Sequence, residues 1–507
     1  MKQNYLNGLS INKRVFFISA TLVFVFILMT LYDPKNAKEV LESSKNWTLS
    51  NFDWLFSFTT NTILIFILFI LVSPYGKIRL GGDDAKTEFS NFSWISMLFS
   101  AGMGIGLIYY GAAEPISHYT GWWYTPFGVE ANTQAAKDLA FGATMYEWGL
   151  HVWALYGLVG LSLAFFSYNK NLPFSIRSIF YPILKDDIYG YKGDIIDIFA
   201  VITTIFGLAT SLGLGAEQIG SGLNFLFGIN STVNLQIFII GFITLVATLS
   251  VLKGLQGGIK ILSNITIVLA LIFLSFSIAV SSSDMLLAYF KTFYSYSTNI
   301  FQFSGFLDRE DTAWYHGWSV FYWAWWIAWS PFVGMFIARI SKGRTIREFL
   351  GAVIFIPTLF ILIWMSTFGT IGIEQVDNNI GGLSNGITQI SLTTFQLLEN
   401  LPFSNFTSFI AITLLVIFFV TSSDSGSLVI DTITSGGKLE TQRKYRVFWA
   451  LLEGIVAMCL LYVGGTEALS ALQAGSLVTA LPFTIVLLIM CYSLFKGLNR
   501  YLLDNEI

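Results

Sequence analysis

Runs of apolar residues recur along the whole chain, and short polar connections separate them. A bilayer with a hydrocarbon core about 30 Å thick requires about 20 apolar residues per helix. Twelve runs of that size predict twelve transmembrane helices. They cover approximately residues 14–32, 54–75, 91–112, 140–167, 194–213, 233–252, 259–281, 316–338, 349–372, 407–430, 446–464 and 472–495. The longest connections have no room for a separate soluble domain, so the pattern predicts an all-α polytopic membrane protein.

The composition agrees with a membrane protein and excludes several other classes. Charged residues make up 12% of the chain and hydrophobic residues 54%, whereas soluble domains have about 25% charged residues. The 28 basic and 31 acidic side chains nearly balance, which excludes a nucleic-acid partner of the polybasic kind. Only two cysteines are present, so a disulfide scaffold and a four-cysteine metal site are excluded.

The distribution of basic residues predicts the orientation of the chain. If the N-terminus is cytoplasmic and twelve helices alternate in direction, 22 of the 28 Lys and Arg residues lie on the cytoplasmic side, Lys2 and Lys253 among them. Cytoplasmic loops carry such an excess of basic residues. We therefore expect a multi-pass protein of the cell membrane with both termini in the cytoplasm.

Two of the predicted helices contain residues that interrupt a helix. The third has three glycines at alternate positions in Ala101–Gly106, and the eighth has Ser330 and Pro331 near its middle. Each interruption alone also fits close helix packing or a proline kink. Paired interruptions in two halves of a chain are typical of transporters built from inverted repeats, whose binding sites lie at the unwound helices.

Large aromatic side chains gather on one face of two predicted helices. Trp148, Trp153 and Tyr156 lie within a 140° arc of the fourth helix. The eighth helix carries Trp318, Phe321, Trp325 and Trp329 at intervals of three, four and four, with Trp326 beside Trp325. Ring faces hold a quaternary ammonium group, whose methyl groups cannot donate hydrogen bonds. Aromatic packing between helices is the alternative explanation.

The tenth helix brings three oxygens together. The carbonyl of Phe418 and the hydroxyls of Thr421 and Ser422 can face one point, and a hard cation prefers oxygen ligands. The alternative is that both hydroxyls bond to the preceding turn of their own helix. Asp424 and Glu114 lie near or within spans, where acidic residues are functional or paired by default. The three histidines share no metal-ligand spacing, so we interpret them as structural groups.

Five segments of the chain resemble the betaine/choline/carnitine transporter family. They are AGMGIGLIYYGAAEP (101–115), EWGLHVWALY (147–156), TTIFGLATSLGLGAEQIG (203–220), FYWAWWIAWSPFVGMFIARISKGRTIREF (321–349) and FFVTSSDSGS (418–427). The resemblance covers approximately residues 50–495. It implies two N-terminal helices followed by a five-plus-five inverted repeat with two unwound helices, and a homotrimer.

With these implications the chain divides into five parts. Residues 1–90 form the N-terminal region with the first two helices, 91–281 the first repeat and 316–495 the second repeat. Residues 282–315 form an extracellular connection in which Leu307–Gly317 reads as an interfacial helix, with an ordinary loop as the alternative. Residues 496–507 form a short cytoplasmic tail without a long basic extension.

The resemblance also implies roles for individual residues. Trp148, Trp153, Tyr156 and Trp326 correspond to an aromatic box for a trimethylammonium group. The rest of the substrate path corresponds to Phe321, Trp325, Trp329, Met103 and the glycines Gly102, Gly104 and Gly106. Sodium ligands correspond to the backbone of Ser100 and Met103, the carbonyl of Phe418 and the hydroxyls of Thr421 and Ser422, with a second site at Thr204 and Phe332. Ala328 and Leu208 stand where a hydroxyl is expected.

These residues predict a sodium-coupled symporter of glycine betaine or a similar zwitterionic quaternary ammonium or sulfonium solute, with sodium as coupling ion and no other cofactor. Choline carriers of the family have Asp where this chain has Gly106, which favours a zwitterion here. The alternative is a choline or carnitine/butyrobetaine transporter, including a sodium-independent exchanger, against which Thr421 and Ser422 argue. No nucleophile–base pair or metal cluster indicates an enzyme.

Overall fold

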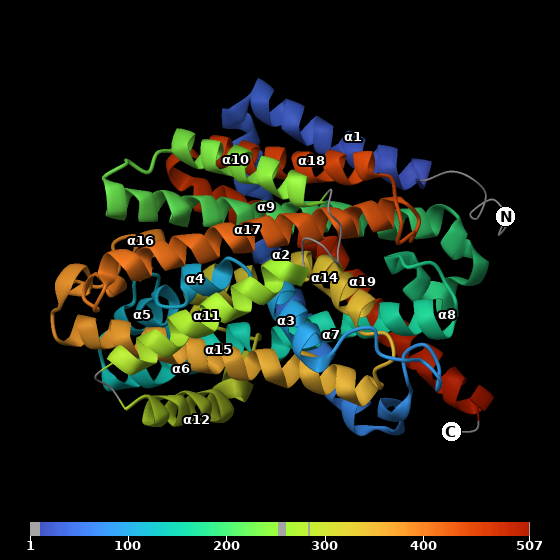
Figure 1. The fold of residues 1–507 in the computed structure, drawn as a ribbon, viewed down its shortest axis with the longest axis horizontal. Coiled ribbons are helices and arrows are strands. Elements are labelled where there is room, and N and C mark those ends of the chain that lie inside the picture. The colour runs from blue at the N-terminus through green and yellow to red at the C-terminus, as the bar shows by residue number, and fades with distance from the viewer. Residues whose placement is uncertain (1–10, 252–259, 282–283, 506–507) are drawn as a thin grey trace.

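The computed structural model describes residues 11–251, 260–281 and 284–505, and α-helices make up most of them (Figure 1). Within these ranges the only β-type pairings are two isolated bridges, Arg79 with Thr345 and Trp122 with Tyr124. Lys2 and Lys253, which entered the charge argument, lie outside the described residues. The prediction of an all-α protein is confirmed.

The helices of the first half are α1 Lys13–Tyr32, α2 Pro34–Val72, α3 Asn91–Gly102, α4 Gly106–Tyr110, α5 Ala113–Thr120, α6 Gln134–Trp148, α7 Leu150–Ala164, α8 Tyr181–Leu184, α9 Tyr191–Phe227, α10 Val233–Val251 and α11 Lys260–Val280. Those of the second half are α12 Met285–Ser304, α13 Thr312–Tyr315, α14 Phe321–Ile340, α15 Ile346–Asp377, α16 Ile390–Glu399, α17 Ser404–Thr434, α18 Arg443–Gly464 and α19 Ala468–Asn505. Short 3₁₀ or π segments join several of them, such as the π turn His316–Val320 before α14.

Eleven helical segments of the described chain are long and apolar enough to cross a membrane. They correspond to eleven of the twelve predicted spans, so this is a multi-pass membrane protein. The remaining predicted span, residues 91–112, is divided between α3 and α4, each of which is too short to cross alone.

The first predicted interruption is present. Helix α3 ends at Gly102 and α4 begins at Gly106. Between them Gly104 has φ = +41°, a backbone conformation that residues with a Cβ rarely adopt. A further interruption, which the sequence analysis did not predict, separates α6 from α7. There Gly149 has φ = −92° and ψ = −131°, directly after Trp148.

The prediction of a second unwound helix at Ser330 and Pro331 is wrong. Helix α14 continues through Pro331 without interruption. A proline lacks the N–H that would bond the carbonyl four residues earlier, which is the carbonyl of Ile327. The hydroxyl of Ser330 donates a hydrogen bond to that carbonyl at 2.8 Å and thereby satisfies it. The residue before the proline thus repairs the helix that the proline was expected to break.

The segment Leu307–Gly317, expected to form an interfacial helix or a loop, is non-helical up to Asp311 and helical from Thr312 onward, and its place at the membrane interface stays a prediction. Trp314 on α13 is fully buried. The connection also contains the 20-residue helix α12, which packs against α6 and α15 at the edge of the molecule (Figure 1).

The broken segment lies inside the helix bundle. Helix α3 contacts α14 and α17, α4 contacts α9, and α14 packs against both α7 and α9. The first described residues of α1 and the last of α19 lie at the same end of the molecule (Figure 1), as an even number of spans requires.

Candidate functional site

The three glycines of the broken segment each face an indole ring. A Cβ atom on Gly102 would lie 2.4 Å from Trp153. A Cβ on Gly104 would lie 2.9 Å from Trp329. Real Cβ atoms do not approach other atoms this closely, so only glycine lets these rings reach the backbone.

The third glycine, Gly106, faces two rings at once. A Cβ atom there would lie 2.8 Å from Trp148 and 2.9 Å from Trp325. The GxGxG pattern and the aromatic residues, which are distant in the sequence, therefore form one structural unit. Helix α3–α4 supplies the backbone, and α6, α7 and α14 supply the rings.

The rings themselves form two groups. Trp148 contacts Trp326 edge to face with ring centroids 4.9 Å apart, and Trp326 stacks on Trp325 at 4.7 Å. Trp153 and Tyr156 form a separate edge-to-face pair at 5.5 Å. The four residues expected to form one box are thus two ring pairs, one beside Gly106 and the other beside Gly102.

Two tyrosines that the sequence analysis did not single out belong to the first group. Tyr322 stacks on Trp326 at 5.6 Å and meets Trp148 at 5.5 Å. Tyr110 lies 6.2 Å from Trp148. Tyr322 stands four residues before Trp326, so helical spacing alone places both on the same face of α14.

Most of the indole N–H groups have partners in the protein. Those of Trp148, Trp325, Trp326 and Trp329 donate to Glu114 Oε2 (2.8 Å), Ser211 Oγ (3.1 Å), the carbonyl of Glu147 (2.9 Å) and the carbonyl of Gly207 (3.0 Å). The indole N–H of Trp153 and the hydroxyl of Tyr156 are buried without such a partner. Since buried polar groups are normally hydrogen-bonded, this pair has donors available for a ligand.

Of the two α17 hydroxyls expected to bind sodium, one has hydrogen-bond partners and the other has none. The hydroxyl of Thr421 donates to the carbonyls of Ile417 at 3.0 Å and Phe418 at 3.1 Å, in its own preceding turn. The hydroxyl of Ser422 is buried without a hydrogen-bond partner and lies 3.6 Å from the position of a Cβ on Gly104. Ser422 is therefore the oxygen that faces the broken helix.

The remaining residues expected to bind sodium lie in the break, on α9 and on α14. Met103 is buried in the break, and the side chain of Ser100 lies outside the described part of the structure. The hydroxyl of Thr204 on α9 is buried without a hydrogen-bond partner. Phe332 packs against Trp329 at 5.5 Å. Leu208, one turn after Thr204, fits against Gly426 and brings no oxygen.

The two acidic residues expected to be functional lie in different places. Asp424 accepts a hydrogen bond from Ser250 of α10 at 2.7 Å and so faces α10. Glu114 accepts from Trp148 and from the hydroxyl of Tyr322, so it supports the first ring group directly.

Sequence reasoning missed His118 and Glu147 as partners of Glu114. One carboxylate oxygen of each glutamate and Nε2 of His118 lie within 4.8 Å of one another, and all three residues are buried. The cluster contains a single histidine with two carboxylates, one of them on another helix, so histidine spacing in the sequence does not indicate it. The spacing of Glu114 and His118, one helical turn apart, was the available signal.

A cavity of about 270 Å³ opens between α14 and α17, beyond the ion-site residues. Its walls include Met335, Phe336, Leu428, Thr432 and Arg446. At a rise of about 1.5 Å per residue, Met335 lies about 9 Å along α14 from Trp329. The cavity therefore lies further along α14 and α17 than the ring clusters.

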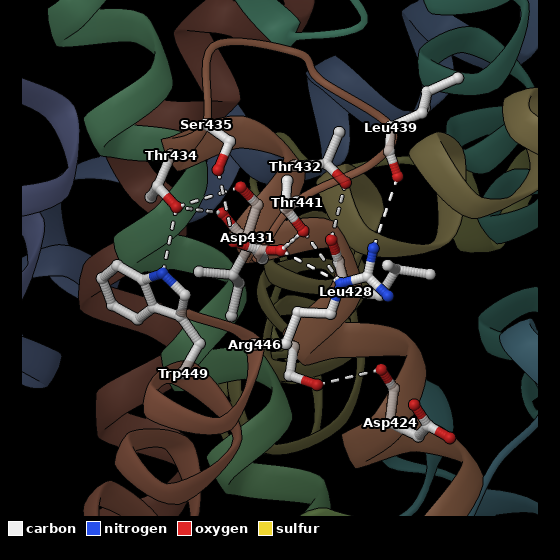
Figure 2. A network of polar contacts seen from close by, with 12 residues as sticks. Asp424, Leu428, Asp431, Thr432, Thr434, Ser435, Leu439, Thr441, Arg446 and Trp449 are labelled. Carbon is white, nitrogen blue, oxygen red and sulfur yellow. Dashed lines mark hydrogen bonds and ion pairs between the residues drawn. The ribbon is translucent and has the colours of Figure 1, made fainter. Parts of the chain in front are cut away.

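A polar network beside this cavity joins the ends of α17 and α18 (Figure 2). Arg446 bonds Asp431 at 3.2 Å and Thr441 at 3.0 Å. The indole of Trp449 donates to Thr434 at 3.0 Å. These contacts fix the loop between the two helices next to the cavity.

Comparison with known proteins gives one family over the whole membrane region. The family described as betaine/carnitine/choline family transporter matches residues 14–502 of this chain. Glycine betaine transporter 1 of Vibrio parahaemolyticus is 52% identical over 97% of this chain and 94% of its own length. A glycine betaine/proline/choline/ectoine transporter of the same organism is 52% identical over 98% of this chain and 88% of its own length. The glycine betaine transporter of Acinetobacter baylyi is 41% identical over 97% of this chain and 74% of its own length.

Proposed function

The chain belongs to the betaine/carnitine/choline transporter family, and from this premise we propose that it carries glycine betaine into the cell by sodium-coupled symport. The observation that carries the proposal is the contact of Gly102, Gly104 and Gly106 with indole rings. A trimethylammonium group needs ring faces, and a carboxylate needs N–H groups that an unwound backbone supplies. At this site the ring faces and the unwound backbone lie side by side.

Sodium coupling is proposed from the same region. Ser422 directs a buried hydroxyl without a hydrogen-bond partner toward Gly104, and Thr204 has a second such hydroxyl nearby in the bundle. Neutral oxygens of this kind are ligands for a hard cation. An ion bound beside the broken helix would hold the backbone that also forms the substrate site. Ion binding and substrate binding would then depend on each other, as symport requires.

Uptake by proteoliposomes tests the proposed function. Purified protein is reconstituted, and labelled betaine, choline and carnitine are offered with an inward sodium gradient or with potassium in its place. We expect betaine to accumulate only with sodium. Equal accumulation with potassium would contradict symport, and accumulation of carnitine by exchange in either salt would support the exchanger instead.

Gly106→Asp tests the preference for a zwitterion. An aspartate here adds a negative charge beside the rings, which favours a net cation such as choline and repels the carboxylate of betaine. Its Cβ also has no room until Trp148 and Trp325 move. We expect choline uptake to appear and betaine uptake to fall about tenfold or more, measured with labelled substrates in transport-deficient cells.

Gly106→Ala separates the two effects, because it adds the same Cβ without the charge. We expect alanine to reduce betaine uptake through the contacts with the rings but not to admit choline. Choline uptake by the unmodified protein at the rate of betaine uptake would contradict the role assigned to Gly106.

A further inference from the structure

Glu114, His118 and Glu147 direct three polar atoms toward one buried point. Nε2 of His118 lies 3.7 Å from Oε1 of Glu114 and 3.8 Å from Oε2 of Glu147. These distances are too long for direct hydrogen bonds. None of the three atoms has a hydrogen-bond partner in the described protein, and all three side chains are fully buried.

The other polar atoms of the cluster are held by donors from the surrounding helices. Trp148 and Tyr322 donate to the second oxygen of Glu114. Ser319 donates to the second oxygen of Glu147 at 2.9 Å. These donors fix both carboxyl groups in the orientation that turns one oxygen of each toward the common point.

The hydrogen bond from Trp314 determines the tautomer of His118. The indole N–H of Trp314 lies 3.1 Å from Nδ1 of His118, and an indole nitrogen can only donate. Nδ1 must therefore carry a lone pair, and the proton of the neutral ring is on Nε2. Since a metal needs the lone pair of its ligand nitrogen, His118 does not serve as a metal ligand through Nε2 while this bond exists.

Two carboxyl groups therefore face each other and an N–H group without a paired cation. Arg309, whose charge acts on Glu147, is itself bonded to Asp311 at 2.7 Å. Three tyrosines also interact with the pair: Tyr110 of α4, Tyr146 of α6 and Tyr322 of α14. In a site of low dielectric constant, two such carboxylates cannot both remain ionised.

We propose that Glu114 and Glu147 together bind one exchangeable proton, and that this proton is released when substrate enters the adjacent ring cluster. The second part rests on the proposed function. Both residues are attached to the rings. Oε2 of Glu114 accepts from the indole of Trp148, and the main-chain carbonyl of Glu147 accepts from that of Trp326.

The direction of the linkage follows from charge. A trimethylammonium group against Trp148 and Trp326 stabilises the ionised form of the pair, so binding expels the proton. By reciprocity, loss of the proton strengthens binding. The Kd for betaine should then fall as pH rises through the titration of the free site, by at most tenfold per pH unit for one proton, and become constant at higher pH.

Calorimetry on the purified protein in buffers of different ionisation enthalpy counts the protons released per betaine bound. We expect up to one proton per betaine and a pH-dependent Kd for the unmodified protein. Glu147→Gln keeps an acceptor for Ser319 and the main-chain carbonyl but leaves only one carboxyl group at the point, so the shared proton is lost and release and pH dependence should both vanish. Glu453→Gln, which alters a buried acid beside Ser423 on another helix pair, should behave like the unmodified protein.

Several outcomes would overturn the proposal. Betaine binding by the unmodified protein without proton release at any pH from about 5 to 9 is one, and proton release that survives Glu147→Gln but disappears in His118→Gln is another. A stoichiometric metal ion in the purified protein, lost in Glu147→Gln, is a third. If betaine does not bind, the proposed function fails, while the infrared band of a protonated carboxyl group, present in the free protein and lost in Glu147→Gln, still tests the proton site.

Discussion

Trp326→Leu should weaken glycine betaine binding by up to about thirtyfold. A desolvated ring contributes about 2 kcal/mol to holding a cation, and 1.4 kcal/mol corresponds to tenfold in Kd. Trp326 stacks on Trp325 and meets Trp148, so its loss also loosens the neighbouring rings. Trp326→Phe keeps a ring face and loses only the bond to the carbonyl of Glu147, so we expect a loss of a few-fold. Isothermal titration calorimetry measures both values.

A second buried tryptophan provides the control. Trp449 is as deeply buried as Trp326 but lies in the network between α17 and α18 (Figure 2). Trp449→Leu should lower the stability of the protein by a comparable amount and leave the Kd for betaine unchanged. Equal affinities of Trp326→Leu and Trp326→Phe would contradict a role of the ring face in binding.

The sequence predicted the parts of the fold that depend on local composition. Apolar runs located the helices because each must be long enough to cross the bilayer. Alternate glycines located the break between α3 and α4, because glycine both destabilises a helix and permits the positive φ of Gly104. These signals are properties of short segments, so no knowledge of neighbouring helices was needed.

The parts that the sequence did not predict depend on contacts. Pro331 does not break α14, because the hydroxyl of Ser330 satisfies the carbonyl that the proline leaves free. Trp314 reads as an interfacial residue, yet its indole is buried against His118. The division of the rings into two groups likewise follows from how α6, α7 and α14 pack around the glycines.

The cluster of Glu114, His118 and Glu147 also depends on contacts between helices, so the sequence alone did not predict it. Each residue alone reads as a single polar group near a span, and the two glutamates are 33 positions apart in the sequence. Only the packing of α5 against α6 brings their carboxyl groups to one point. Glu114 was recognised as functional because an acid in a membrane needs a partner, but its partners could not be named.

Thr421→Ala combined with Ser422→Ala should abolish sodium-driven uptake of betaine, a decrease of at least about tenfold toward background. The substitutions remove both α17 hydroxyls proposed as sodium ligands, and a hard cation is not held by methyl groups. Labelled betaine uptake by proteoliposomes with a sodium gradient measures the effect. Of the single variants, we expect Ser422→Ala to lose more, because its hydroxyl has no other partner in the described protein.

Thr413→Ala is the matched control for this pair. Its hydroxyl, like that of Thr421, bonds a carbonyl of the preceding turn on α17, at 2.8 Å, but it lies two turns before Thr421 and is half-buried. Its loss should leave uptake unchanged. If Thr421→Ala alone also behaved like this control while Ser422→Ala abolished uptake, the hydroxyl of Thr421 would serve only its own helix. Undiminished sodium-driven accumulation in the double variant would mean that the coupling ion is held by neither of these two hydroxyls.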